Sequence, residues 1–134
     1  MTTPENVTRK ILVVEDEPSI SDVCRRVLTK EGFEVDIAID GRVAQDMVAQ
    51  KQYDLYLIDI RTPVMNGMKL YEWLKENHPQ MTQRVIFTTG DMLGSDIGSF
   101  LEATGRPFLP KPFSPDGLKA IVKEALRSIE SQGV

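Results

Sequence analysis

Five side chains of the kinds that bind metal ions and phosphate follow short hydrophobic runs along this chain. They are Glu15, Asp16, Asp59, Thr89 and Lys111. In an open sheet of parallel strands, ligands bind beyond the carboxyl ends of the strands. If the hydrophobic runs are such strands, three carboxylates, one hydroxyl and one ammonium meet at one edge of the sheet.

Three carboxylates in one place need cations beside them. Each pair repels by roughly 4 kcal/mol at about 4 Å and an effective dielectric constant of about 20. Lys111 supplies one positive charge, and Mg²⁺, which prefers oxygen ligands and keeps several waters, is predicted to supply the rest. Such a site suits a phosphoryl group, whose transfer depends mostly on placement and charge neutralisation. Asp59 is the predicted nucleophile and would form an acyl phosphate.

The elements that must position these side chains alternate along the chain. Strands are predicted at residues 10–14, 33–38, 55–59, 84–89 and 107–110. Helices are predicted at residues 18–30, 41–51, 67–77, 91–105 and 115–129. This alternation indicates an α/β fold, a doubly wound five-stranded parallel sheet with helices on both faces.

Prolines and glycines add detail to this prediction. Pro107 and Pro110 lack the N–H that a central strand needs, which places the fifth strand at an edge of the sheet. Gly94 and Gly98 each cost a helix about 1 kcal/mol relative to alanine, so the fourth helix is predicted to be weak. Ser114 is the predicted N-cap of the last helix.

The composition is that of one ordinary globular domain. The chain has 134 residues, of which 41% are hydrophobic and 27% charged. Residues 1–9 are predicted to be a flexible tail or linker remnant, and residues 10–131 the domain. No signal peptide or membrane-length apolar run occurs, so a cytoplasmic location and no membrane contact are expected. With a net charge of −4 and no basic patch, direct nucleic-acid binding is not expected.

The chain has one cysteine, Cys24, which excludes an intramolecular disulfide and a site of paired cysteine ligands. It is predicted to be a small buried hydrophobic residue.

Four segments, ILVVEDEP, YDLYLIDIRTPVMNG, VIFTTG and FLPKPF, resemble in order and spacing the signature segments of the response-regulator receiver domain. The resemblance extends from Lys10 to the last helix and implies a flavodoxin-like, chemotaxis-regulator-like fold with strand order 2-1-3-4-5. It implies that Asp59 accepts a phosphoryl group from a histidine kinase or a histidine phosphotransfer protein. The sequences around TTGD and ATGRPFLPKPF are more similar to receivers of hybrid sensor histidine kinases.

The same resemblance implies the ligands of the metal ion. Asp16 and Asp59 would bind Mg²⁺ directly, together with the backbone carbonyl of Arg61. Glu15 would act through a water molecule.

The resemblance also implies a switch. Thr89 would hydrogen-bond the phosphoryl oxygens, Lys111 would pair with them, and Phe108 would rotate inward, although a plain core role for Phe108 is an equal alternative. Thr89 is preferred to Thr88 because a small residue, Gly90, follows it. The Lys111–Pro112 peptide bond is predicted to be cis.

One hypothesis goes beyond the resemblance. Arg61 and Asp91 each lie two residues after a site residue, so they are predicted to pair across the mouth of the site and slow hydrolysis of the acyl phosphate.

The site residues are compatible with four functions to different degrees. The preferred one is a phosphoacceptor that is not itself an enzyme, although it promotes its own phosphorylation and dephosphorylation. Because the sequence ends after the last helix, its output is expected to be a contact with another chain or domain. The resemblance implies that this contact, with a downstream protein, uses the fourth helix and fifth strand.

The alternatives are an interaction module that is never phosphorylated, an aspartyl-phosphate phosphatase and a flavin-binding protein. Such a phosphatase usually has a second aspartate where this chain has Arg61, and the loop EDEPS is too acidic for a flavin phosphate.

Overall fold

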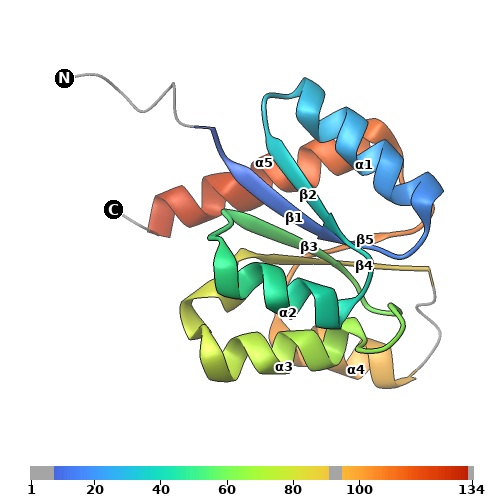
Figure 1. Ribbon diagram of the computed structural model, residues 1–134, viewed down its shortest axis with the longest axis vertical. Helices are drawn as coiled ribbons and strands as arrows, with labels where there is room; N and C mark the ends of the chain where they lie inside the picture. The colour runs from blue at the N-terminus through green and yellow to red at the C-terminus, as the bar shows by residue number, and fades with distance from the viewer. Residues whose placement is uncertain (1–7, 91–94, 133–134) are drawn as a thin grey trace.

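The protein, described here from a computed structural model, is a five-stranded sheet between two layers of helices (Figure 1). The structure describes residues 8–90 and 95–132. The strands are β1 (Lys10–Val14), β2 (Glu34–Ala38), β3 (Leu55–Asp59), β4 (Val85–Thr89) and β5 (Phe108–Pro110). The helices are α1 (Pro18–Lys30), α2 (Gly41–Gln50), α3 (Gly67–Asn77), the 3₁₀-helix η2 (Pro79–Arg84), α4 (Ser95–Thr104) and α5 (Pro115–Gln132).

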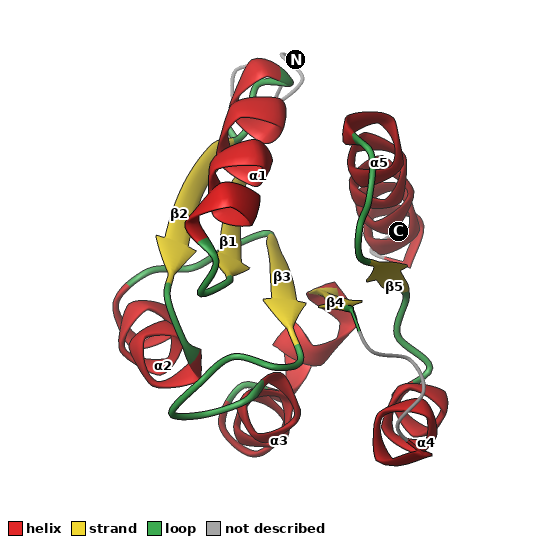
Figure 2. Ribbon diagram, turned by 90° about the vertical axis from the view of Figure 1, so that its right-hand side faces the viewer, coloured by secondary structure: helices red, strands yellow, loops and turns green. Residues whose placement is uncertain are grey.

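The sheet is parallel, and its strand order is β2-β1-β3-β4-β5. Seen nearly end-on, α1 and α5 cover one face, and α2, α3 and α4 cover the other (Figure 2). Both the predicted fold and the edge position of β5 are confirmed.

Alternate side chains of the strands form two cores, one on each face of the sheet. Along β1, Leu12 and Val14 pack toward α2 and α3, whereas Ile11 and Val13 pack toward α1 and α5. Strands β3 and β4 are buried along their whole length. Central strands covered on both faces are rigid supports for the residues at their ends.

Most element boundaries agree with the predictions to within one or two residues, and α5 runs three residues further than predicted. The 3₁₀-helix η2 was not predicted, because its residues, PQMTQR, carry no hydrophobic repeat. The predicted fourth helix began at residue 91; the structure describes it from Ser95 onward, and residues 91–94 lie outside the described part.

Polar caps begin the helices that start near the site. The Asp40 side chain accepts the Val43 N–H at 2.9 Å at the start of α2, and the Asn66 side chain accepts the Lys69 N–H at 2.9 Å at the start of α3. The predicted cap Ser114 is confirmed, because its Oγ accepts the Gly117 N–H at 3.0 Å. None of the helices in the described ranges is both long and apolar enough to cross a membrane.

Candidate functional site

Three acidic side chains meet at the carboxyl edge of the sheet, as predicted. Each of Glu15, Asp16 and Asp59 has a carboxylate oxygen within 4.8 Å of one oxygen of each of the others. Glu15 and Asp59 are buried, at 3% and 4% exposure, and Asp16 is exposed. This donor set consists of oxygens and opens to solvent through Asp16, which fits a hard divalent cation such as Mg²⁺.

Lys111 lies between the two buried carboxylates. Its Nζ is 2.8 Å from Glu15 Oε1 and 2.9 Å from Asp59 Oδ2, and Glu17 Oε1 is 3.6 Å away. The sequence predicted Lys111 as the compensating cation. It did not indicate Glu17, because a glutamate after a strand end has no pattern that separates it from any loop acid.

Burial and charge act on the pKa values of this group in opposite directions. Burial is the main cause that raises the pKa of Glu15, and the negative charge of Asp59 raises it further. The hydrogen bond from Lys111 lowers this pKa, but not enough to cancel the rise. Burial alone would lower the pKa of Lys111, but hydrogen bonds to Glu15 and Asp59 outweigh it and raise that pKa. Lys111 is therefore held in its charged form by the carboxylates that it bridges.

The turn after β3 fixes the direction of the Asp59 side chain. The Arg61 N–H donates to Asp59 Oδ1 at 3.1 Å, and the Ile60 N–H donates to the Thr88 carbonyl at 3.0 Å. The Gly67 N–H donates to the Ile60 carbonyl at 2.9 Å, which closes the loop at the start of α3. The metal-ligand role of the Arg61 carbonyl stays a prediction.

A close backbone approach holds this turn against the strand. A Cβ atom added at Gly67 would lie 2.7 Å from the Asp59 carbonyl oxygen and 2.8 Å from the Ile60 Cα. Because real Cβ atoms do not approach backbone that closely, glycine at position 67 is a requirement of the site.

The two adjacent threonines occupy different faces of the sheet. The register pairs Asp59 with Thr88, and Thr89, at the end of β4, pairs with Pro110. Both side chains are buried. Because side chains alternate along a strand, Thr88 shares the face of Asp59, whereas Thr89 shares the face of Phe87 and α4. The choice of Thr89 therefore still rests on the resemblance.

Comparison with known proteins decides the family. Residues 11–123 match the model of the response regulator receiver domain. The chain belongs to this family. Receiver domains are the phosphoacceptors of two-component signalling; they bind Mg²⁺ through acidic residues and interact with histidine kinases or phosphotransfer proteins.

Individual relatives agree with this assignment. The chain is 32% identical over 117 residues to the response regulator ArlR of Staphylococcus epidermidis. The aligned region covers 87% of this chain and 52% of the relative. The chain thus spans about half the length of that relative.

Two solved receiver structures have the same fold. A CheY-like receiver domain protein of Methanospirillum hungatei JF-1 superposes with a TM-score of 0.85 at 29% identity, covering 93% of this chain and 98% of the other. The receiver domain of a signal transduction histidine kinase of Syntrophus aciditrophicus gives a TM-score of 0.82 at 27% identity, covering 91% and 92%.

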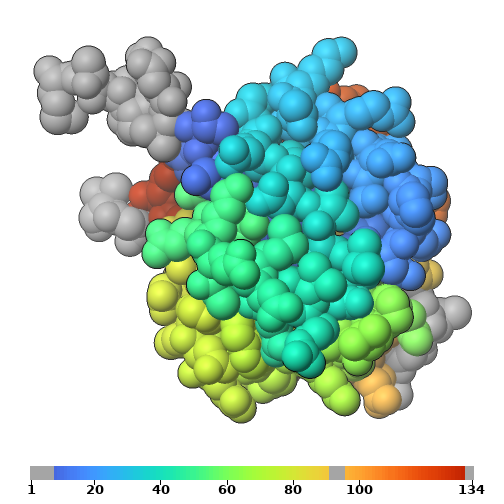
Figure 3. Space-filling model, viewed as in Figure 1, coloured from blue at the N-terminus to red at the C-terminus, as the bar shows by residue number. Residues whose placement is uncertain are grey.

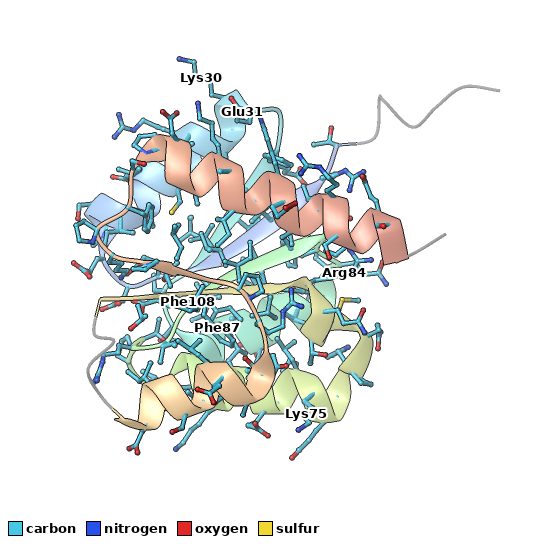
Figure 4. The ribbon with its side chains drawn as sticks, turned by 180° about the vertical axis from the view of Figure 1, so that it is seen from behind. Lys30, Glu31, Lys75, Arg84, Phe87 and Phe108 are labelled. Carbon is cyan, nitrogen blue, oxygen red and sulfur yellow. The ribbon has the colours of Figure 1, made fainter. Side chains whose placement is uncertain are left out.

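Within this receiver domain, Phe108 lies on β5 beside Phe87 (Figure 4). Its residue is 38% exposed, whereas Phe87 is fully buried. The alternative of a plain core role for Phe108 is therefore wrong. Its role as a switch stays a prediction.

Two further predictions, on the Lys111–Pro112 peptide bond and on Cys24, are confirmed. The Lys111–Pro112 peptide bond is cis, as predicted. Cys24 is buried, and burial raises the pKa of its thiol to about 12. The predicted Arg61–Asp91 pair stays untested, because Asp91 lies outside the described residues.

Proposed function

We propose that this receiver domain, residues 10–131, accepts a phosphoryl group on Asp59 from the phosphohistidine of a histidine kinase or a histidine phosphotransfer protein. The observation that carries the proposal is the bridge of Lys111 between Glu15 and Asp59. A buried carboxylate that already has a fixed ammonium beside it is placed for a reaction that adds negative charge at that carboxylate.

In the proposed reaction, a carboxylate oxygen of Asp59 attacks the phosphorus atom of phosphohistidine. An O–P bond forms, and the N–P bond breaks with its electron pair returning to the imidazole nitrogen. The side chain that was a monoanion becomes an acyl phosphate, whose oxygens carry more charge. Lys111 then pairs with the phosphoryl oxygens and keeps Glu15 as its second partner.

The fit of the acidic cluster to a divalent cation supports a role for Mg²⁺. Asp16, Asp59 and the backbone carbonyl of Arg61 would hold it directly, and Glu15 through water. When bound, Mg²⁺ neutralises charge on the transferred phosphoryl oxygens.

Phosphorylation of Asp59 is proposed to change the surface formed by α4 and β5. Thr89 would bind the phosphoryl oxygens, and Phe108 would rotate inward. The register supports this coupling, because Phe108 pairs with Phe87 and Thr89 lies two residues after Phe87 on the same face. The downstream protein would bind the changed α4–β5 surface. Receivers fused to hybrid histidine kinases are one setting in which such a domain acts.

The test is transfer from a protein donor. Purified histidine phosphotransfer domains, labelled with ³²P on histidine, are mixed with the wild type and with Asp59→Asn. We expect label on the wild type only, and its loss when Mg²⁺ is chelated. Transfer to Asp59→Asn at the rate of the wild type would overturn the proposal, because the acceptor would be another residue.

A further inference from the structure

Large hydrophobic side chains are exposed at three places in the described residues. They are Ile39 at 60%, Val64 at 83% and Phe108 at 38%. Ile39 lies in the loop between β2 and α2, and Val64 in the loop between β3 and α3. Both loops lie at the carboxyl edge of the sheet, where Asp59 is placed.

The backbone at Val64 is strained. Its φ is 66°, and the Met65 N–H donates to the Pro63 carbonyl at 2.6 Å around it. A three-residue turn with a positive φ at its centre is rare, and a β-branched residue is especially unfavourable there. Glycine or asparagine would adopt this conformation at lower cost. At 83% exposure, packing does not explain a valine at this position.

Hydrogen bonds join the two loops. The Met65 carbonyl accepts the Gly41 N–H at 3.1 Å and the Thr62 hydroxyl at 2.8 Å. A Cβ atom added at Gly41 would lie 2.4 Å from the same oxygen, so the loops are in close contact. Ile39 and Val64 are therefore presented from two fixed, adjoining loops. In Figure 3 the teal surface near residue 40 adjoins the green surface of the loop after β3, at the right of the molecule.

We propose that Ile39 and Val64 form an apolar docking surface for the protein that carries the phosphohistidine. This proposal rests on the proposed function, and it identifies residues of the receiver domain that the phosphodonor protein would contact. Asp59 is only 4% exposed, so a protein donor must cover the carboxyl edge to reach it. The loop that presents Val64 begins at Ile60, directly after Asp59, and closes at Gly67.

Such a surface suits a helix with apolar side chains next to its histidine. Burying exposed apolar area stabilises the complex, and loops fixed before binding lose little conformational entropy on docking. This accounts for a strained, exposed valine that the fold itself does not need.

The experiment compares two phosphodonors on the variants Val64→Asn, Ile39→Ser and the double variant. One donor is the ³²P-labelled histidine phosphotransfer domain that phosphorylates the wild type fastest in a panel. The other is acetyl phosphate, which needs no docking surface. We expect the transfer rate from the protein donor to fall roughly tenfold in the double variant, which corresponds to about 1.4 kcal/mol. The rate with acetyl phosphate is expected to stay unchanged.

Two controls keep folding and binding apart. Val64→Asn should raise the midpoint of thermal unfolding, because asparagine tolerates a positive φ. Val64→Leu retains the apolar side chain and should keep the transfer rate of the wild type.

Several results would overturn the inference. Equal transfer rates from the protein donor would do so, and so would equal losses with both donors, which would point to damage at Asp59. A change in the oligomeric state of the double variant in sedimentation would show that a second copy of this chain covers the surface. Failure of both donors on the wild type would instead contradict the proposed function.

Discussion

The charge balance of the site depends on Lys111. It is the cation that lies within 3 Å of both buried carboxylates, Glu15 and Asp59. Removing one partner from a buried ion pair costs about 3 kcal/mol, because the other charge stays desolvated. For Lys111→Gln in Mg²⁺-free buffer at pH 7, we expect a loss of this order in the free energy of unfolding, measured by urea denaturation.

Lys51→Gln is the matched control for that experiment. Lys51 pairs with Asp36 at 3.0 Å near the surface, where solvent screens the interaction, so a much smaller loss is expected. Adding Mg²⁺ should increase the free energy of unfolding more in Lys111→Gln than in the wild type. Equal losses in the two variants would show that the bridge does not stabilise the site.

Glu15 predicts a pH dependence of a definite sign. Because burial raises its pKa in the folded protein above the unfolded value, the folded state binds the proton more tightly. The contribution of Glu15 to stability is therefore largest below the unfolded pKa and is lost as the pH rises through the folded pKa. The free energy of unfolding of the wild type, relative to Glu15→Gln, should increase from pH 7 to pH 4. A decrease over that range would contradict the direction of the shift.

At the level of single residues, the sequence indicated which groups meet but not how they are arranged. The types and positions of Asp59 and Lys111 were predictable, because each follows a hydrophobic run. The bridge to Glu15 was not, because it depends on how far a flexible lysine side chain reaches across β1 and β3. The strained φ of Val64 was not predictable either, since valine is among the residues least suited to that conformation.

Alanine substitutions at two glycines, one in α3 and one in α4, are expected to change the stability in opposite directions. At Gly67, the start of α3, a Cβ atom would collide with the backbone of Asp59 and Ile60. Gly67→Ala should therefore destabilise the fold by more than 1 kcal/mol and lower the rate of Asp59 phosphorylation. At Gly98, inside α4, nothing lies within 4 Å of the added atom, and Gly98→Ala should stabilise by about 1 kcal/mol.

Thermal unfolding of both variants checks this pair of predictions. A tolerated alanine at position 67 would mean that the turn after β3 can move without cost. A destabilising alanine at position 98 would mean that α4 uses glycine for a reason other than softness.

At the level of elements, the sequence predicted what hydrophobic period and capping determine. The bounds of β1, β3, α1 and α3 follow from such local patterns. The 3₁₀-helix η2 could not be predicted, because its residues have no hydrophobic periodicity. The contact between the β2–α2 and β3–α3 loops was also unpredictable, because its hydrogen bond joins Gly41 and Met65, far apart in the sequence.

Over the whole molecule, rings on three elements connect the sheet to α4. Tyr71, Phe87 and Phe100 have ring centroids 5.3 to 5.7 Å apart and come from α3, β4 and α4. Phe87 also pairs in register with Phe108 on β5. A rotation of Phe108 toward the sheet would therefore act on the packing of α4.

This arrangement predicts different outcomes for the two threonines. Thr89→Ala should still be phosphorylated at Asp59, but amide hydrogen exchange in α4 should no longer change on phosphorylation. Thr88→Ala, the matched control on the other face, should keep that change. If Thr88→Ala loses it and Thr89→Ala keeps it, then Thr88 is the switch, as its register with Asp59 would allow.

The most direct test of the account is the intact mass of the protein after incubation with acetyl phosphate, with and without Mg²⁺. We expect the wild type to gain the mass of one phosphoryl group only when Mg²⁺ is present, and Asp59→Asn to gain none. An unchanged mass of the wild type in Mg²⁺ would contradict the phosphoacceptor function and favour an interaction module that works without phosphorylation. A gain in Asp59→Asn equal to that of the wild type would place the acceptor elsewhere.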